Sequence, residues 1–434
     1  MIRKAACWLA GFEFVFLATV GLGAPLSKPA DQRSLKYLLA NVGPQPSLGL
    51  APGVVIAGTT KAHPDYFYHW VRDAALVMNV VGRMANHAPA QRRRYDDLLA
   101  GFAAFSRKNQ ETPTFTGLGE PKFYVTGKAY LEPWGRPQND GPALRASTFI
   151  RWATRLLDEG RCGEVVPNLY DAKLPSDSLI KRDLEFVAHH WRESCFDLWE
   201  EINGTHFYTR LAQRRALVDG AVLADRLGDG AAATFYREQA ATINRDLKRF
   251  WNPSRKVIMP TLDRTGGIEY KDSDLDTSVL LAIIHSGEDR GDWSPSDPRV
   301  QSTLNALVEK FRTIYKVNDN GQTGVALGRY PEDRYDGVGT GSEGNPWFLT
   351  TLSAAELLYR SASREAAEGG DARAVKLRRR DADSFMTRAL AHAGSDGRMA
   401  EQFNRYTGLE QGAKNLTWSF AAHVSAALAR DGYN

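Results

Sequence analysis

The sequence predicts an all-α fold in which six pairs of helices close into an (α/α)6 barrel, a six-hairpin toroid. Three observations predict it. Apolar residues recur with helical spacing along most of the chain, strand patterns are rare, and the expected helices are even in number. We prefer a closed barrel to an open helical solenoid because the sequence contains no self-similar repeat of fixed period.

Apolar stripes mark the helices one by one. Ile180, Leu184, Val187 and Trp191 follow the i, i+4, i+7, i+11 spacing, and similar stripes run through 240–250, 304–314 and 348–359. Only the Val-Val-Ile segment at 54–56 is typical of an extended strand. The secondary structure is therefore expected to be almost entirely helical.

Stripes and helix breakers together predict about twelve helices. They are expected to begin near Gln32, Asp73, Gln91, Pro142, Ser178, His206, Ala231, Asp274, Val300, Pro346, Asp381 and Asn415. Long loops enter most of the even-numbered helices, at 44–72, 109–141, 251–273, 317–345 and 394–414. If successive helices are antiparallel, these loops lie at one end of the barrel, where helix N-termini add partial positive charge. We expect the functional site at that end.

The composition indicates a soluble globular enzyme or binding protein. Hydrophobic residues make up 43% of the 434 residues and charged residues 24%, which excludes extensive disorder. The net charge of +4 is too small to indicate a nucleic-acid partner. We expect a single domain over residues 25–434 that acts as a monomer, with no appended module, because no Ser-, Thr- or Pro-rich linker follows the last helix.

Residues 1–24 have the parts of a secretory signal peptide. Arg3 and Lys4 precede an apolar stretch, and small residues follow at 21–24. Because Glu13 interrupts the apolar stretch, we expect cleavage near Ala24 and a secreted chain without a membrane anchor. Two cysteines then remain, Cys162 and Cys195, and we expect both to be free thiols.

The long loops combine aromatic side chains with charged and amide side chains. Such clusters occur at 65–73, 134–141, 197–201, 328–333 with 345–347, and 400–403. Sugars present apolar ring faces and a rim of hydroxyl groups, so they bind to aromatic platforms with hydrogen-bonding partners beside them. The loops are therefore interpreted as a sugar-binding site.

Four of the motifs occur in the order seen in a known family. They are Asp65-Tyr66-Phe67-Tyr68 with Trp70 and Arg72-Asp73, Gly-Glu-Pro-Lys-Phe at 119–123, Asp-Leu-Trp-Glu-Glu at 197–201 and Leu-Thr-Trp-Ser at 416–419. From about Gln32 to its end, the chain resembles glycoside hydrolase family fifteen, and within it the fungal glucoamylases. The resemblance implies an exo-acting, inverting hydrolase that releases β-glucose from the non-reducing ends of starch, glycogen and malto-oligosaccharides. It implies faster action on α-1,4 than on α-1,6 linkages. We expect the chain to lack the starch-binding domain that some members carry.

The resemblance also implies roles for individual residues. Glu200 is implied to be the general acid and Glu401 the general base. The positions implied to contact the sugar are Tyr66, Trp70, Arg72, Asp73, Trp134, Glu201 and Arg329, with Trp347 as a weaker candidate. Two carboxyl groups suffice for this hydrolysis, because one protonates the leaving oxygen and the other activates a water. We therefore expect no metal and no cofactor.

Two other sequence motifs partly match known binding motifs, one for a dinucleotide and one for calcium. Neither match is supported by the residues around it. The Gly339-x-Gly341-x-x-Gly344 pattern fits a dinucleotide fingerprint but follows no strand. The run from Asp272 to Asp276 begins like a calcium loop, yet Ile283 stands where the twelfth-position glutamate is needed. Neither match changes the expectation of an enzyme without a cofactor.

Two alternative functions stay open. An enzyme with the same barrel could act on another glucoside, such as trehalose or an α-1,6-linked glucan, and would differ in its rim loops. A catalytically silent glucan-binding protein could also use this scaffold, but it would be expected to have lost Glu200 or Glu401.

Overall fold

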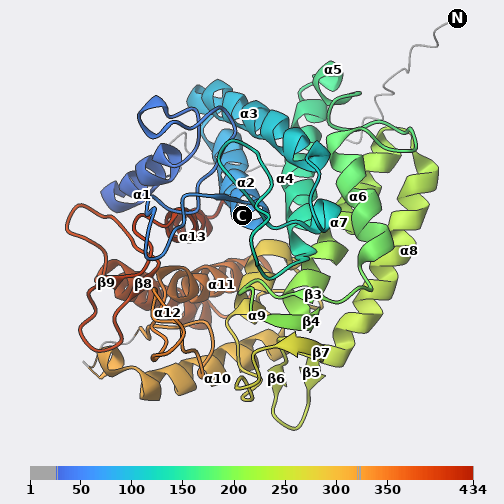
Figure 1. Cartoon of the computed structure of the whole chain (residues 1–434). Helices are drawn as coiled ribbons and strands as arrows, with labels where there is room; N and C mark the ends of the chain where they lie inside the picture. The colour runs from blue at the N-terminus through green and yellow to red at the C-terminus, as the bar shows by residue number, and fades with distance from the viewer. Residues whose placement is uncertain (1–25, 27, 320, 322–323, 434) are drawn as a thin grey trace, which may run out of the picture.

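The computed structural model describes residues 26, 28–319, 321 and 324–433, so the predicted leader lies outside the described residues. An inner ring of helices surrounds the barrel axis (Figure 1). The inner helices are α2 (Val71–His87), α4 (Asp140–Asp158), α7 (Phe207–Arg226), α9 (Ser278–Ser286), α11 (Phe348–Ala367) and α13 (Thr417–Arg430). Each of them contacts the next around the ring, and α13 contacts α2. The ring is therefore closed.

An outer helix precedes each inner helix in the chain. The outer helices are α1 (Pro29–Ala40), α3 (Arg92–Glu111), α6 (Leu179–His190), α8 (Gly230–Leu247), α10 (Pro298–Ile314) and α12 (Ala372–Leu390). One extra turn, α5 (Cys162–Val165), lies between α4 and α6. The predicted all-α class and the six-pair barrel are confirmed.

The amphipathic stripes explain the two rings. An inner helix packs on both neighbours and on its outer partner, so nearly its whole surface is apolar and buried, as in α13. An outer helix buries one stripe only, as α10 does with Val300, Leu304, Leu307 and Phe311. Short 3-10 turns in the described part of the chain are η1 (Pro46–Leu48), η2 (Pro89–Gln91), η3 (Gly117–Gly119), η4 (Lys248–Phe250) and η5 (Lys316–Asn318).

All of the described strands lie in the loops that enter inner helices, and all pair antiparallel. Their bounds are β1 (His69–Trp70), β2 (Lys122–Phe123), β3 (Cys195–Phe196), β4 (Ile202–His206), β5 (Trp251–Asn252), β6 (Val257–Ile258), β7 (Thr261–Gly267), β8 (Gln402–Phe403) and β9 (Glu410–Gln411). The pairs are β1 with β2, β5 with β6 and β8 with β9, and β4 lies between β3 and β7. These small sheets fix the shapes of the long loops.

The structure corrects two expectations about secondary structure. The segment at 54–56 is buried but forms no strand, because only Val55 makes an isolated bridge, to Val42. Helix α12 begins at Ala372 instead of near Asp381. Its first turns carry mostly exposed polar residues without an apolar stripe, and the Asp371 side chain caps them by accepting a hydrogen bond from the Arg373 amide. The other eleven predicted starts lie within four residues of the observed ones.

Cys195 is buried and is a free thiol, so it forms no disulfide with Cys162. Among the helices in the described part of the chain, none combines the length and the apolar character needed to cross a lipid bilayer.

A buried charge cluster joins the first helix to the last. Asp31 on α1 lies 2.8 Å from Arg430 and 3.1 Å from His423, both on α13. Although burial raises the pKa of Asp31, its hydrogen bonds to His423 and Arg430 outweigh burial and lower that pKa below the ordinary aspartate value. The ionised form of Asp31 is therefore favoured by folding, and the cluster stabilises the contact between α1 and α13.

We predict that Asp31→Asn lowers the free energy of unfolding by about 3 kcal/mol, because it removes a buried carboxylate that bonds to both Arg430 and His423. Urea denaturation at neutral pH measures the loss. Since folding lowers the pKa of Asp31, wild-type stability should fall as the pH drops below the ordinary aspartate value, and the variant should lack this part of the acid dependence. Asp97→Asn, at an exposed position of α3, is the control and should change stability by less than about 0.5 kcal/mol. Equal stability of the two variants would contradict the role of the cluster.

Candidate active site

A cavity of about 500 Å3 lies at the end of the barrel where the long loops meet. All ten residues that the sequence singled out line it: Tyr66, Trp70, Arg72, Asp73, Trp134, Glu200, Glu201, Arg329, Trp347 and Glu401. They come from five different loops and from the first turn of α2. The expected location of the site at this end is therefore matched by the geometry.

Glu200 occupies a tight turn between β3 and β4. Its φ of 68° lies in the left-handed region, which is costly for a residue with a side chain. Asp197 holds the turn, because its side chain accepts hydrogen bonds from the amides of Glu201 (2.8 Å) and Ile202 (3.1 Å). The backbone of the turn thus fixes the direction of the Glu200 side chain.

Hydrogen-bond donors converge on one oxygen of Glu200. Trp70 Nε1 donates to Oε1 at 2.8 Å and Gln138 Nε2 at 3.0 Å, while Arg72 Nη2 lies 3.6 Å from the same oxygen. No residue in the described part of the chain hydrogen-bonds to Oε2. The carboxyl group is therefore oriented by one oxygen, and the other remains available to a bound molecule.

Arg72 anchors a buried charge cluster at the start of α2. It donates to Asp140 at 2.9 Å and to Gln138 at 2.8 Å, and it lies 3.9 Å from Asp73. Burial, only partly opposed by Arg72, raises the pKa of Asp73 to about 7. Asp73 can therefore either accept or donate a hydrogen bond near neutral pH.

Arg329 anchors a second charge cluster across the cavity. Its guanidinium donates to Asp333 at 2.6 and 2.8 Å and to Glu201 Oε1 at 2.8 Å. Tyr330 donates to the other oxygen of Glu201 at 2.6 Å. Burial raises the pKa of Glu201, and Arg329 opposes that rise. The bidentate pair with Asp333 fixes the plane of the guanidinium at the cavity wall.

Glu401 is fully buried and lies in the loop before α13. Tyr66 donates to Oε1 at 2.6 Å, and Tyr335 lies 3.3 Å from Oε2. Burial raises the pKa of Glu401 to about 7, although the hydrogen bond from Tyr66 favours the ionised form. Gly412 has a φ of 78°, and a Cβ there would stand 2.4 Å from Oε2, so only glycine fits against the carboxylate.

Aromatic rings around Lys122 form the mouth of the cavity. Its ammonium group lies 3.7 to 4.4 Å from the ring centres of Tyr68, Trp70, Tyr130 and Trp134. Burial lowers the pKa of Lys122 to about 8. Neighbouring rings meet at tilted or edge-to-face angles around the ammonium group and give this part of the cavity an aromatic wall against which a sugar ring can lie.

Some residues that position the site were not singled out from the sequence, among them Lys122, Gln138 and Tyr335. Lys122 stands inside the quoted motif at 119–123, and Gln138 inside the loop motif at 134–141, so a signal for both was present. Tyr335 lies in a loop without a recognised motif, and only its contact with Glu401 shows its place. These residues orient the neighbouring side chains.

The arrangement can deliver a proton on one side of a bound molecule and take one up on another. Glu200 and Glu401 line the same cavity. Burial raises the pKa of Glu401, whereas Glu200 receives hydrogen bonds from Trp70 and Gln138 on one oxygen. Aromatic rings and buried arginines supply the remaining surface. These features suit a site for a hydroxyl-rich substrate.

Comparisons with known proteins agree with this geometry. The family model "Glycosyl hydrolases family 15" matches residues 32–428. A glucoamylase of Blastobotrys adeninivorans is 40% identical over 88% of this chain and 68% of that protein. An intracellular sporulation-specific glucoamylase of Saccharomyces cerevisiae is 34% identical over 91% of this chain and 81% of its own length. The solved structure of a family 15 glucoamylase from Hypocrea jecorina has a TM-score of 0.82 at 32% identity, covering 92% of this chain and 71% of that one.

We predict that Tyr66→Phe raises the pKa of Glu401, because the hydrogen bond from the phenol favours the carboxylate. A carbon NMR titration of glutamate-labelled protein follows this carboxyl group, and its midpoint should move to higher pH. Tyr406→Phe is the matched control, since that hydroxyl bonds to Glu343 outside the cavity. An unchanged midpoint in Tyr66→Phe would mean that the contact does not stabilise the ionised form.

Proposed function

The chain belongs to the glycosyl hydrolases of family 15, and we propose that it is a glucoamylase that removes glucose from the non-reducing ends of starch, glycogen and malto-oligosaccharides. In this proposal it cleaves α-1,4 linkages faster than α-1,6 linkages. The observation that carries the proposal is that Glu200 and Glu401 line one cavity together with aromatic rings and two buried arginines. The relatives named as glucoamylases support the substrate class.

Exo-action follows from the shape of the site in this proposal. The buried clusters of Arg72 and Arg329 border the cavity, and the aromatic rings around Lys122 border its mouth. The arginine clusters and Asp73 would bind the hydroxyl groups of the terminal glucose by charge-assisted hydrogen bonds. The following sugar would lie against Trp134 at the mouth.

Glu200 is proposed as the general acid. Its free Oε2 would deliver a proton to the glycosidic oxygen, while the donors to Oε1 keep the carboxyl group in place. As the bond breaks, Glu200 becomes a carboxylate, and Trp70, Gln138 and Arg72 stabilise the developing charge. The strained turn at Glu200 is consistent with a residue placed for function.

Glu401 is proposed as the general base. Its ionised form would take a proton from a water that attacks the anomeric carbon from the face opposite the leaving group. The hydroxyl groups of Tyr66 and Tyr335 stabilise that ionised form and orient it. Glu200 lies in the loop before α7, and Glu401 lies in the loop before α13. These two helices stand on opposite sides of the inner ring, which leaves space for the substrate and the water between the two carboxyl groups.

Secretion is part of the proposal. It is supported by the leader-like composition of residues 1–24 alone. N-terminal sequencing of protein recovered from the medium tests it and should begin near residue 25.

We predict that Glu200→Gln and Glu401→Gln each lower kcat on maltose by about 10²- to 10⁴-fold or more, because each removes one proton transfer. Both variants should keep the fold and bind maltose. Glucose release from soluble starch, maltose, trehalose and dextran measures both the activity and the preference for one glycosidic linkage over another. Glu269→Gln, at an exposed position before α9, is the control and should keep full activity. A kcat above one tenth of the wild-type value in either variant would overturn the assignment, and faster hydrolysis of trehalose than of maltose would overturn the substrate.

We predict that maltose releases β-glucose as its first product. An inverting enzyme leaves about 6.5–9.5 Å between its carboxyl groups for a water, whereas a retaining enzyme holds them about 5–5.5 Å apart and uses the second as a nucleophile. Proton NMR during the first minutes of hydrolysis distinguishes the anomers before mutarotation mixes them. An initial excess of α-glucose would refute Glu401 as a base acting through water.

A further inference from the structure

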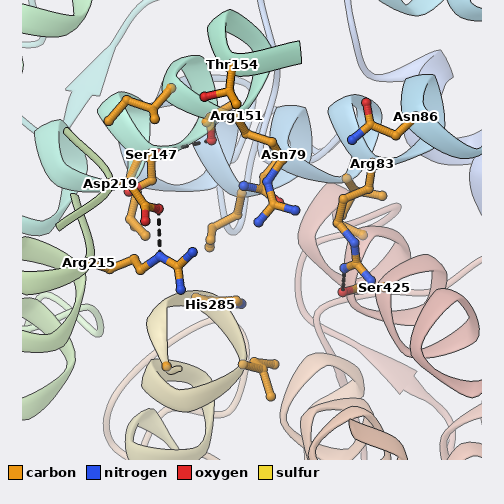
Figure 2. Close-up of a pocket in the computed structure, with 18 of the residues that line it drawn as sticks. Asn79, Arg83, Asn86, Ser147, Arg151, Thr154, Arg215, Asp219, His285 and Ser425 are labelled. Atoms are coloured by element: carbon orange, nitrogen blue, oxygen red, sulfur yellow. Dashed lines mark hydrogen bonds and ion pairs between the residues drawn. The ribbon is translucent and has the colours of Figure 1, made fainter. Parts of the chain in front are cut away.

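A second cavity, of about 720 Å3, opens at the other end of the barrel. All six inner helices line it, and Figure 2 labels residues from five of them. The residues that matter most are Arg83 on α2, Arg151 on α4, Arg215 on α7, His285 on α9, Arg360 on α11 and Ser425 on α13. Figure 2 shows the labelled side chains of five of these helices around one open space. We call this space the axial cavity.

The axial cavity is separate from the catalytic cavity. Trp418 borders both of them, and the ring of His285 lies 5.9 Å from the Trp418 ring. Tyr208 hydrogen-bonds to His285 at 3.0 Å and so fixes the His285 side chain in the wall of the axial cavity. None of the ten residues that line the catalytic cavity and were singled out from the sequence lines the axial cavity.

Three of the four arginines named above have protein partners. Arg215 pairs with Asp219 at 2.6 Å. Arg360 donates to the Ile284 carbonyl at 2.6 Å and lies 3.2 Å from Asp289. These contacts fix both guanidiniums at the cavity wall.

The guanidinium of Arg83 hydrogen-bonds to neutral acceptors, and the nearest carboxylate lies farther away. It donates to the Ser425 hydroxyl at 2.6 Å and to the Tyr433 carbonyl at 2.8 Å, while Glu356 stands 3.9 Å away. Burial, together with the charges of Arg151 and Arg360, lowers the pKa of Arg83 to about 10 even though Glu356 opposes the change. Arg83 is therefore a buried cation close enough to Arg151 and Arg360 to be affected by their charges.

Arg151 is the unpaired cation of the axial cavity. Its side chain forms neither an ion pair nor a hydrogen bond with any residue in the described ranges, and it is exposed to the solvent inside the cavity. The surrounding protein and the charges of Arg215 and Arg360 lower its pKa below the ordinary arginine value, against the opposing pull of Asp219 and Asp289. An anion bound beside Arg151 would relieve this repulsion.

We propose that the axial cavity binds a small phosphorylated solute. A phosphate group offers three acceptor oxygens, which suits guanidiniums that come from three separate helices, at Arg151, Arg215 and Arg360. A carboxylate offers only two oxygens in one plane and fits a single guanidinium. The phosphate would lie on Arg151, whose donors are free.

The volume of the axial cavity and the polar residues in the rest of its wall indicate a ligand larger than inorganic phosphate. Its volume lies within the range of about 300–1,000 Å3 that is usual for small-molecule sites. Asn79 and Asn86 on α2 also line it, and their side-chain amides hydrogen-bond to no described residue. These amides would bind hydroxyl groups on the organic part of the solute.

Isothermal titration calorimetry tests this with glycerol 3-phosphate as the probe, because it carries a phosphate and hydroxyl groups but no glucose ring for the catalytic cavity. Wild-type protein should bind glycerol 3-phosphate, and inorganic phosphate more weakly, but not glycerol. Arg151→Gln should weaken binding about tenfold or more, since it removes charge-assisted hydrogen bonds. Arg264→Gln, at an exposed position of β7, makes the same charge change and should bind like wild type.

Maltose hydrolysis by Arg151→Gln should equal that of wild type, which shows an intact fold and keeps this test independent of the catalytic proposal. Equal affinity in the two variants, or no binding of either phosphate at 0.15 M ionic strength, would overturn the site. Binding of citrate but of neither phosphate would overturn the assigned class of ligand.

Discussion

The catalytic end depends on one buried guanidinium. Arg72 sits at the start of α2 and contacts Asp140 at the start of α4 and Glu200 in the loop before α7, so it joins three of the six inner pairs. A buried cation is tolerated only when it is paired and hydrogen-bonded, which forces these three segments into one arrangement. Arg329 does the same for the loop before α11 and for Glu201. The two arginines convert separate loops into one rigid wall.

That wall explains how two glutamates acquire different environments. Glu200 follows Asp197 in a strained turn and receives its donors on a single oxygen, from Trp70 and from Gln138, which also bonds to Arg72. Glu401 lies against the backbone of Gly412, is fully buried, and receives the Tyr66 phenol. Different surroundings make it possible for like groups to take opposite parts in proton transfer. The asymmetry is built into the backbone of the loops.

The periodicity of apolar residues was sufficient to predict the helices of the barrel. Each helix must bury an apolar stripe, and that requirement leaves a pattern within the helix's own stretch of sequence. Periodicity failed at α12, whose first turns are stabilised by the Asp371 cap and by exposed polar residues instead of an apolar stripe. The small sheet of β3, β4 and β7 could not be predicted either, since its strands are short and far apart in the chain. The ten residues expected at the site do line one cavity, but Tyr335 reaches Glu401 only through the fold of its loop.

The sequence could not predict that arginines line the axial cavity, because an arginine on a helix is usually exposed to solvent. One conventional explanation is that they compensate the partial negative charge at helix C-termini, an effect confined to the last turn. Other residues already fill that place: His87 in α2, Arg155 in α4, Arg226 in α7 and Arg364 in α11. Arg83, Arg151, Arg215 and Arg360 lie further back along the same helices, where the helix dipole gives them little. Arg83, Arg215 and Arg360 have partners in the cavity wall, so the proposed anion rests on Arg151, which has none among the described residues.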